Sequence, residues 1–171
     1  FWIISAKLDG IDRKEKRNPK FLSLDYFKFI IIERMFLENK DNLFAKARQL
    51  GFSEFAACNV AYNFIFIPNS VNVIVAGQGD YADKTMQNVI GGLNNLANSE
   101  FYKRRRPDRA DYIKASYTEV WEDEETGEKR TLYKGYGSEV YAITAKDNTQ
   151  AVSRLSPFFV VYEEIGLWKK G

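Results

Sequence analysis

Two adjacent glutamates near the end of the chain are the first candidates for chemistry. Glu163 and Glu164 follow five apolar residues, 158–162, which predict a short buried strand. Side chains alternate along a strand, so the two carboxylates point in different directions. α/β sheets bind ligands at the carboxyl ends of their strands, where one carboxylate can hold a divalent metal while the other orients a water molecule. The plainer alternative is that adjacent acids mark a solvated strand end.

A second candidate is the sequence KARQLGFS, which begins at Lys46. A nucleotide phosphate is held by backbone N–H groups at a helix N-terminus, by a lysine and by a hydroxyl that ligates magnesium. Gly51 allows a sharp turn, and Ser53 stands where a helix begins, as both cap and metal ligand. The usual phosphate loop places lysine directly before Ser or Thr, and Phe52 occupies that position here. Lys46 and Arg48 are therefore the cations that can reach the phosphates.

Neither motif is specific when it is taken alone. A strand, a glycine turn and a capped helix form a common joint, and basic residues beside such a joint are usually solvated. Together the two motifs supply both halves of a nucleotide site, because Glu163 provides the metal-binding carboxylate that the loop lacks. The two motifs together are therefore stronger evidence for a nucleotide site than either motif alone.

The composition removes several reaction classes. The 171 residues include no histidine, which excludes His-dependent serine and cysteine hydrolases and histidine zinc sites. The single Cys58 cannot form an internal disulfide or a thiolate cluster, and we expect it to be buried on a helix in a reducing compartment. A net charge of +2 does not by itself demand a nucleic-acid partner. Hydrolytic chemistry here must use carboxylates, lysine, arginine and bound metal.

The elements that position these motifs follow from hydrophobic spacing. Residues 43–47 predict a strand before the loop, and residues 53–66 predict an Ala-rich helix. After a break at Pro68, the β-branched residues 71–76 predict a buried parallel strand, and 83–97 predict a second helix. Alternating strands and helices indicate an α/β fold with a mainly parallel sheet flanked by helices.

Two further regions complete the expected architecture. Residues 112–145 alternate between apolar and polar, with a turn at 124–127, and predict an antiparallel hairpin added to the sheet. The spacing in 21–36 predicts another helix packed on the body. There is no run of about 18 apolar residues and no leader pattern, so we expect no membrane span. The length and the 45% hydrophobic content suit a single domain over 1–171.

These motifs resemble those of the ATPase domain of large terminase subunits, the DNA-packaging motors of tailed bacteriophages and prophages. In that family the phosphate loop often carries its lysine at the front, as at Lys46. The segment SPFFVVYEEIG, residues 156–166, is similar to the family's Walker B strand and adjoining catalytic glutamate, although Glu163 stands where Asp is more usual. The resemblance implies a P-loop NTPase fold of the ASCE type. It also implies an adenine-side segment at 1–40 and a nuclease domain that is absent from these residues.

The resemblance implies roles for individual residues. Ser53 and Glu163 would hold Mg²⁺, and Glu164 would activate the attacking water. Lys46 and Arg48 would act on the phosphates of ATP during catalysis. The nucleotide-binding loop would comprise Lys46, Ala47, Arg48, Gln49, Leu50, Gly51, Phe52 and Ser53.

By the same resemblance, Mg²⁺-dependent ATP hydrolysis would drive double-stranded viral DNA into a procapsid. The partners would be DNA, the portal protein, the small terminase subunit and further copies in a homo-oligomeric ring, in the cytoplasm of the infected bacterial host. No nuclease activity is expected from these residues. Two alternatives stay open: a non-enzymatic nucleic-acid or assembly module with a degenerate loop, and a helicase-like ATPase with the same chemistry and another substrate.

Two weaker signals lie in the second half of the chain. The run Lys103-Arg-Arg-Arg106, with Arg109, suits contacts with DNA phosphates or a neighbouring subunit, but such runs are more often solvated loops. Six aromatic residues are expected to pack within the sheet rather than stack on bases. They are Tyr112, Tyr117, Trp121, Tyr133, Tyr136 and Tyr141.

Overall fold

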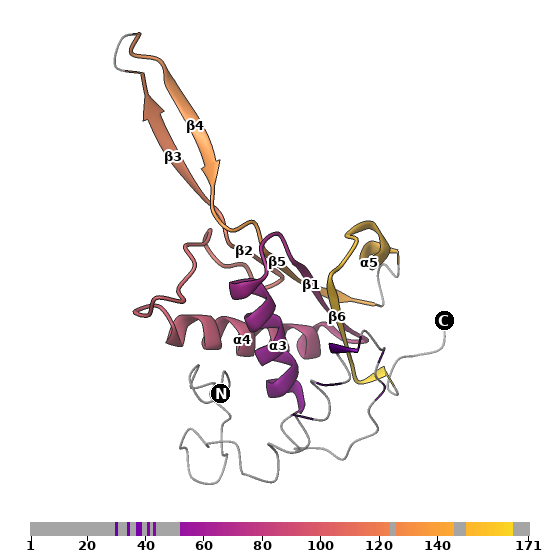
Figure 1. The fold of residues 1–171 in the computed structure, drawn as a ribbon. Coiled ribbons are helices and arrows are strands. Elements are labelled where there is room, and N and C mark those ends of the chain that lie inside the picture. Colours follow the sequence, from indigo (N-terminus) through magenta and orange to yellow (C-terminus); the bar gives the residue numbers. More distant parts are fainter. Residues whose placement is uncertain are drawn as a thin grey trace.

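The computed structural model describes residues 52–123, 126–145 and 150–165, together with residues 30, 34, 37, 38, 41 and 43. Helices and strands alternate in its first half, and strands dominate its second half (Figure 1). The helices are α3 (Phe52–Phe66), α4 (Gly79–Asn95) and the short α5 (Ala151–Arg154). The strands are β1 (Val71–Ala76), β2 (Tyr112–Lys114), β3 (Tyr117–Glu122), β4 (Lys129–Lys134), β5 (Glu139–Thr144) and β6 (Phe159–Glu163).

A four-stranded sheet in the order β2-β5-β1-β6 forms the centre of the molecule. β1 pairs parallel with both β5 and β6, and β2 pairs antiparallel with β5. Because β1 has a strand on each side, every residue from Asn72 to Ala76 is buried, as its β-branched sequence predicts. The expected α/β fold with a mainly parallel sheet is confirmed.

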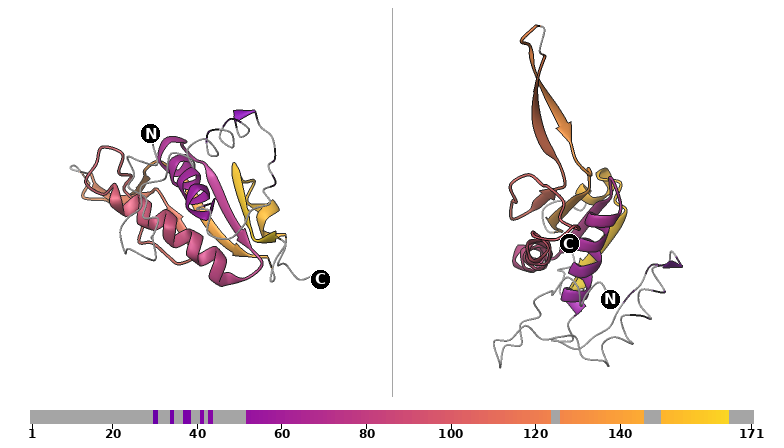
Figure 2. Two further views of the ribbon diagram at one scale, coloured as in Figure 1. Left: turned by 90° about the horizontal axis from the view of Figure 1, so that it is seen from below. Right: turned by 60° about the vertical axis from the view of Figure 1, so that its left-hand side comes forward.

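Helices α3 and α4 pack against one face of this sheet (Figure 2). α3 is apolar on most of its sides, which is typical of an internal helix, and it ends at Phe66 because Pro68 follows. α4 begins at Gly79, earlier than the expected start at Asp83, because the turn after β1 is short. Cys58 is buried on α3, as predicted.

The β3–β4 hairpin is separate from the main sheet and projects away from it (Figure 1). Its ladder runs from Tyr117↔Lys134 to Glu122↔Lys129, with the turn in the predicted place. The predicted antiparallel hairpin is confirmed, and β2 of the same region extends the main sheet antiparallel to β5. The hairpin forms its own two-stranded sheet, and β5 joins the main sheet parallel to β1. Every residue of β4 is exposed, so this strand has no buried face to pack on another layer.

Two glycines fix the base of the hairpin. Gly137 has a φ of 78°, and a Cβ there would lie 2.1 Å from Oδ1 of Asn69. Its N–H donates to the carbonyl of Ala115 at 2.8 Å, and the Ala115 N–H donates to the carbonyl of Ser138 at 2.8 Å. A Cβ on Gly135 would lie 2.7 Å from the Ala115 carbonyl oxygen. The hairpin therefore leaves the body through a tightly packed neck that excludes side chains at these two positions.

Part of the sequence prediction falls outside the described residues. Of the helix predicted at 21–36, Ile30 and Arg34 are described and are helical, and Leu37 just beyond it is helical too. Of the strand predicted at 43–47, only Leu43 is described, and it is exposed and outside any strand. The adenine-side segment at 1–40 stays a prediction. In the part of the chain that the structure describes, no helix is long and apolar enough to cross a membrane.

Candidate functional site

The carboxyl edge of the parallel sheet brings together the ends of β1, β5 and β6. Ala76 at the end of β1 is in register with Thr144 of β5 and with Glu163 of β6. α4 starts directly after β1, so its first turn lies at the same edge, and a Cβ on Gly79 would lie 3.4 Å from Oγ1 of Thr144. This is the edge at which open α/β sheets bind ligands.

Glu163 is the last residue of β6, and its carboxylate is buried at 5% exposure. Because side chains alternate along a strand, Glu163 shares the helix-facing side of β6 with the buried Val161. Ser53 Oγ of α3 donates to Oε2 of Glu163 at 3.3 Å, and Thr85 Oγ1 of α4 donates to Oε1 at 3.2 Å. The first turn of α3, the second turn of α4 and the end of β6 therefore meet at one carboxylate.

The structure thus joins two residues that the sequence selected independently. Ser53 and Glu163 lie 110 positions apart and form a direct hydrogen bond. Ser53 is the second residue of α3 rather than its cap, so the expectation that it caps the helix is corrected. In this position its hydroxyl points at the strand end instead of at the backbone of its own first turn.

The oxygen atoms at this edge suit Mg²⁺. Mg²⁺ takes an octahedron of oxygen ligands at about 2.1 Å, so two neighbouring ligands lie about 3.0 Å apart. The separation between Ser53 Oγ and Glu163 Oε2 is 3.3 Å. Within the described residues no group of three or more Asp, Glu, Cys or His side chains is placed to hold a metal. One carboxylate and one hydroxyl, completed by phosphate and water oxygens, is the ligand set on which Mg²⁺ usually relies in phosphate-handling sites.

Glu164 follows the strand in a different conformation. Its φ is 50°, in the left-handed region that non-glycine residues seldom occupy, and its side chain is half-buried. Such conformations cost free energy and concentrate at functional sites. The strand therefore ends at Glu163, and the backbone leaves the extended conformation at Glu164.

Most of the predicted phosphate loop lies outside the described residues. This holds for Lys46, Ala47, Arg48, Gln49, Leu50 and Gly51. Of the loop, the structure describes Phe52 and Ser53, which open α3, and the Phe52 ring lies 6.2 Å from that of Phe55. The roles of the loop residues stay predictions.

Thr85 is the site residue that the sequence prediction missed. It is 2% exposed although it is polar, and it lies one turn before Val89 on the buried side of α4. A threonine on the apolar face of a helix was the available signal, because a buried hydroxyl needs a partner. The partner, Glu163, comes from a distant strand and was not readable from the local sequence.

A second polar cluster occupies the opposite face of the sheet, at the amino end of β5. Glu139 accepts hydrogen bonds from Lys114 Nζ and from the Tyr141 hydroxyl. Burial raises the pKa of Glu139, but the Lys114 and Tyr141 hydrogen bonds outweigh it and hold that pKa below its ordinary value. Burial, followed by the neighbouring carboxylate, raises the pKa of Tyr141. This cluster is an internally satisfied ion pair.

The six aromatic residues do not share one role, contrary to the sequence prediction. The rings of Tyr112 and Tyr141 pack at 4.8 Å within the main sheet, as expected. Trp121 and Tyr133 are exposed on the hairpin. The rings of Tyr117, Tyr133 and Tyr136 each lie under a basic side chain.

Comparison with known proteins gives one structural likeness to report. No protein family and no curated protein matches the sequence. Among solved structures, the ATPase domain of the large terminase of Thermus phage P74-26, in an arginine-to-alanine mutant, matches at 13% sequence identity with a TM-score of 0.42. The match covers 67% of this chain and 56% of that chain.

Proposed function

We propose that the chain is a Mg²⁺-dependent ATPase whose site lies at the carboxyl edge of the parallel sheet. The hydrogen bond between Ser53 at the start of α3 and Glu163 at the end of β6 carries the proposal. It joins a helix N-terminus, which suits phosphate, to a buried carboxylate, which suits a divalent metal.

The start of α3 binds the phosphates of ATP. α3 spans the 15 residues Phe52–Phe66, and the start of an α-helix favours an anion through its dipole and first-turn N–H groups. The loop of Lys46, Ala47, Arg48, Gln49, Leu50, Gly51 and Phe52 leads into this turn and completes the phosphate contacts. Lys46 and Arg48 neutralise phosphate charge as it develops during hydrolysis.

Ser53 and Glu163 hold Mg²⁺, and Thr85 positions Glu163. Bound Mg²⁺ neutralises negative charge on the β- and γ-phosphate oxygens. The Thr85 hydroxyl donates to the other Glu163 oxygen and fixes the plane of the carboxylate. Ser53 and Glu163 would be the protein ligands of the metal, which would supply positive charge next to the phosphates.

Glu164 orients the attacking water. It directly follows the carboxylate that we assign to the metal, and its backbone is left-handed. A carboxylate at this position accepts the proton of the water as the bond to the γ-phosphorus forms. Positioning and electrostatic stabilisation supply most of the rate enhancement in this kind of reaction.

The wider role that we propose is the packaging of viral DNA. The support is the resemblance of the two sequence motifs to large terminase subunits. In this role the chain moves double-stranded DNA into a procapsid as part of a homo-oligomeric ring, with the portal protein and the small terminase subunit, in the cytoplasm of an infected bacterium. These partners follow from the family resemblance alone.

Replacement of Glu164 tests the proposed chemistry. In the intact protein, Glu164→Ala lowers ATP turnover by about 100-fold or more and leaves nucleotide binding unchanged, because a general base contributes that much to rate and little to affinity. Glu119→Ala, which removes a half-buried carboxylate of β3 that pairs with Lys134, is the matched control and keeps full turnover. Steady-state phosphate release and nucleotide titration are the measurements.

Unchanged turnover in Glu164→Ala would reject the assignment. A separate outcome favours the non-enzymatic alternative: ATP binding that does not depend on Mg²⁺, with Lys46→Ala indistinguishable from the parent.

A further inference from the structure

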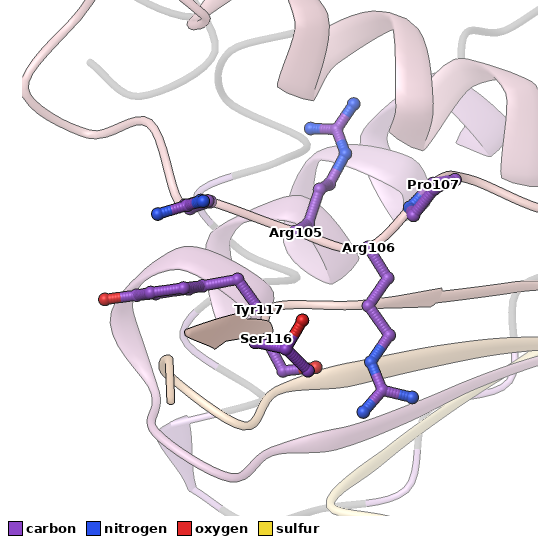
Figure 3. Close-up of a pocket in the computed structure, with 7 residues that line it drawn as sticks. Arg105, Arg106, Pro107, Ser116 and Tyr117 are labelled. Atoms are coloured by element: carbon purple, nitrogen blue, oxygen red, sulfur yellow. The ribbon is translucent and has the colours of Figure 1, made fainter. Parts of the chain in front are cut away.

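The basic segment 103–109 is held in place by backbone hydrogen bonds to the edge strand β2. The Arg106 N–H donates to the carbonyl of Lys114 at 3.2 Å, and the Arg109 N–H donates to the carbonyl of Tyr112 at 3.1 Å. Figure 3 shows Arg105 and Arg106 on opposite sides, with Ser116 on the side of Arg106.

Two of the arginines form ion pairs with nearby aspartates. Arg105 forms a two-point contact with Asp108, with distances of 2.8 and 2.9 Å, and its side chain is only 8% exposed. It also donates to Oδ1 of Asn94 at the end of α4. Arg109 pairs with Asp111 at 3.1 Å. Arg105 thus anchors the segment to the body, which makes it a structural residue.

The other basic side chains rest on tyrosine rings instead. Lys103 Nζ lies 4.4 Å from the Tyr136 ring centre, and the Arg104 guanidinium lies 4.2 Å from that of Tyr117. Among the described residues, neither Arg104 nor Arg106 forms an ion pair with a carboxylate. A ring stabilises a cation through its face, and leaves the guanidinium N–H donors available at its edge.

A pocket of about 300 Å³ opens between this segment and the base of the hairpin. Its lining includes Arg104, Arg106 and Ser116 (Figure 3). Ser116 is 6% exposed, and its hydroxyl oxygen has no hydrogen-bond partner among the described residues. A buried hydroxyl without a partner is unfavourable, so a polar occupant of the pocket that accepts from Ser116 would be stabilising. The volume equals that of about ten liquid waters, which leaves room for a tetrahedral oxyanion.

We propose that Arg104, Arg106 and Ser116 bind a phosphate-class oxyanion at the base of the β3–β4 hairpin. Guanidinium groups and a hydroxyl are donors, and phosphate oxygens accept from both in short charge-assisted hydrogen bonds. None of the described residues that line the pocket carries a carboxylate, so the lining does not repel an anion. The oxyanion is either a free phosphate group or a phosphodiester of a nucleic-acid backbone.

The packing around the pocket keeps its donors in place before the ligand arrives. Gly135 packs directly on the backbone of Ala115 and Ser116, and Arg105 ties the basic segment to α4. A preorganised site loses little conformational entropy on binding. The proposal stands on these contacts and does not depend on ATP hydrolysis at the carboxyl edge.

Titration of the 171-residue chain with inorganic phosphate tests the site. We expect saturable changes in the backbone amide NMR signals of Ser116 and Tyr117. Arg104→Gln and Arg106→Gln each weaken the affinity by about tenfold or more, and Ser116→Ala weakens it by a smaller factor, because a neutral donor contributes less than a charged one. Arg109→Gln, in the same segment but outside the pocket, leaves the affinity unchanged.

The source of the oxyanion is distinguished by a second titration with a short DNA duplex. The ligand is a backbone phosphodiester if two results are found. The duplex shifts the amide signals of Ser116 and Tyr117, and the two arginine-to-glutamine variants at 104 and 106 bind the duplex with a shallower salt dependence than the parent. The expected change in the slope of log K against log salt is about 0.9 for each phosphate that a variant no longer binds. If inorganic phosphate alone shifts the signals, the ligand is a free phosphate group. Both results support the site.

Three results would overturn the proposal. The first is the absence of saturable shifts with either ligand. The second is an equal loss of affinity in Arg109→Gln and Arg106→Gln. The third is loss of the Ser116 signal changes in Ser53→Ala or Glu163→Gln, which would place the bound phosphate at the carboxyl edge instead. Ser116→Ala is the smallest of these side-chain changes, and circular dichroism checks that this variant remains folded.

Discussion

Glu139 and Glu163 belong to the same sheet and are both withdrawn from solvent, yet their surroundings differ. Glu139 is the first residue of β5, on the face away from α3 and α4, and it meets the ammonium group of Lys114. Glu163 is the last residue of β6, on the helix-covered face, and it meets the hydroxyls of Ser53 and Thr85. Among the described contacts, Glu139 is paired with an ammonium group, and Glu163 accepts hydrogen bonds from two hydroxyls.

The position of each glutamate along its strand explains the difference. The amino end of a parallel strand faces the carboxyl ends of the helices, where no phosphate or metal site is formed by the backbone. The carboxyl end faces helix N-termini, where N–H groups and first-turn hydroxyls favour anions and their counterions. We therefore regard the Glu139 cluster as structural and the Glu163 cluster as functional.

Replacing each glutamate by glutamine is expected to show the largest difference in stability between the Glu139 and Glu163 clusters. Glu139→Gln lowers the free energy of unfolding by about 2 kcal/mol, because the charge-assisted hydrogen bond to Lys114 is removed. Glu163→Gln lowers it by less, about 1 kcal/mol, because the amide oxygen of glutamine still accepts a hydrogen bond from one of the two hydroxyls. Urea denaturation measures both. A larger loss in Glu163→Gln than in Glu139→Gln would reverse the assignment of roles.

Removal of the Thr85 hydroxyl has a smaller expected effect. Thr85→Val keeps the shape of the side chain but deletes one donor to Glu163, which lowers the free energy of unfolding by about 1 kcal/mol. Thr131→Val, at an exposed position of β4, is the control and is expected to be nearly neutral. Equal stability losses in the two variants would show that the Thr85 contact does not order the carboxylate.

The pH dependence sharpens the comparison further. The pKa of Glu139 is lower in the folded state than in the unfolded state. The Glu139 carboxylate therefore stabilises the fold above the unfolded pKa, near 4.3, and this stabilisation is lost as the pH falls through the folded pKa. The stability difference between the parent and Glu139→Gln is therefore full at pH 7 and shrinks to a few tenths of a kcal/mol well below pH 4. Denaturation at a series of pH values checks this, and a difference that stays constant down to pH 2 would contradict the ion-pair account.

Local sequence patterns predicted the elements that carry the site. The Ala-rich helix α3, the β-branched strand β1 and the apolar strand before Glu163 are each set by short-range rules of periodicity and turn residues. Ser53 and Glu163 were also readable, because the chemistry of phosphate and metal binding restricts which residue types can serve. Their direct contact, across 110 positions, places Ser53, the last residue of the loop motif, beside Glu163.

The remaining features depend on tertiary packing. The alternation in β5 marks a strand but does not determine its direction, and its parallel pairing with β1 follows from the path of the chain around the hairpin. Thr85 reaches Glu163 only because α4 lies over β6. Likewise, a run of basic residues does not reveal which of them will meet an acid, as Arg105 does, and which will meet a tyrosine ring, as Arg104 does.

The central claim is that Glu163 and Ser53 form a magnesium–nucleotide site, and ATP affinity with and without Mg²⁺ tests it most directly. Glu139→Gln serves as the matched control, since it removes a carboxylate from the same sheet. We predict that Mg²⁺ strengthens ATP binding by the parent and by Glu139→Gln. We predict that Glu163→Gln and Ser53→Ala each weaken binding in Mg²⁺ by about tenfold or more, because each variant removes a metal ligand. If Glu163→Gln binds ATP in Mg²⁺ as tightly as Glu139→Gln does, the carboxyl edge is not the site.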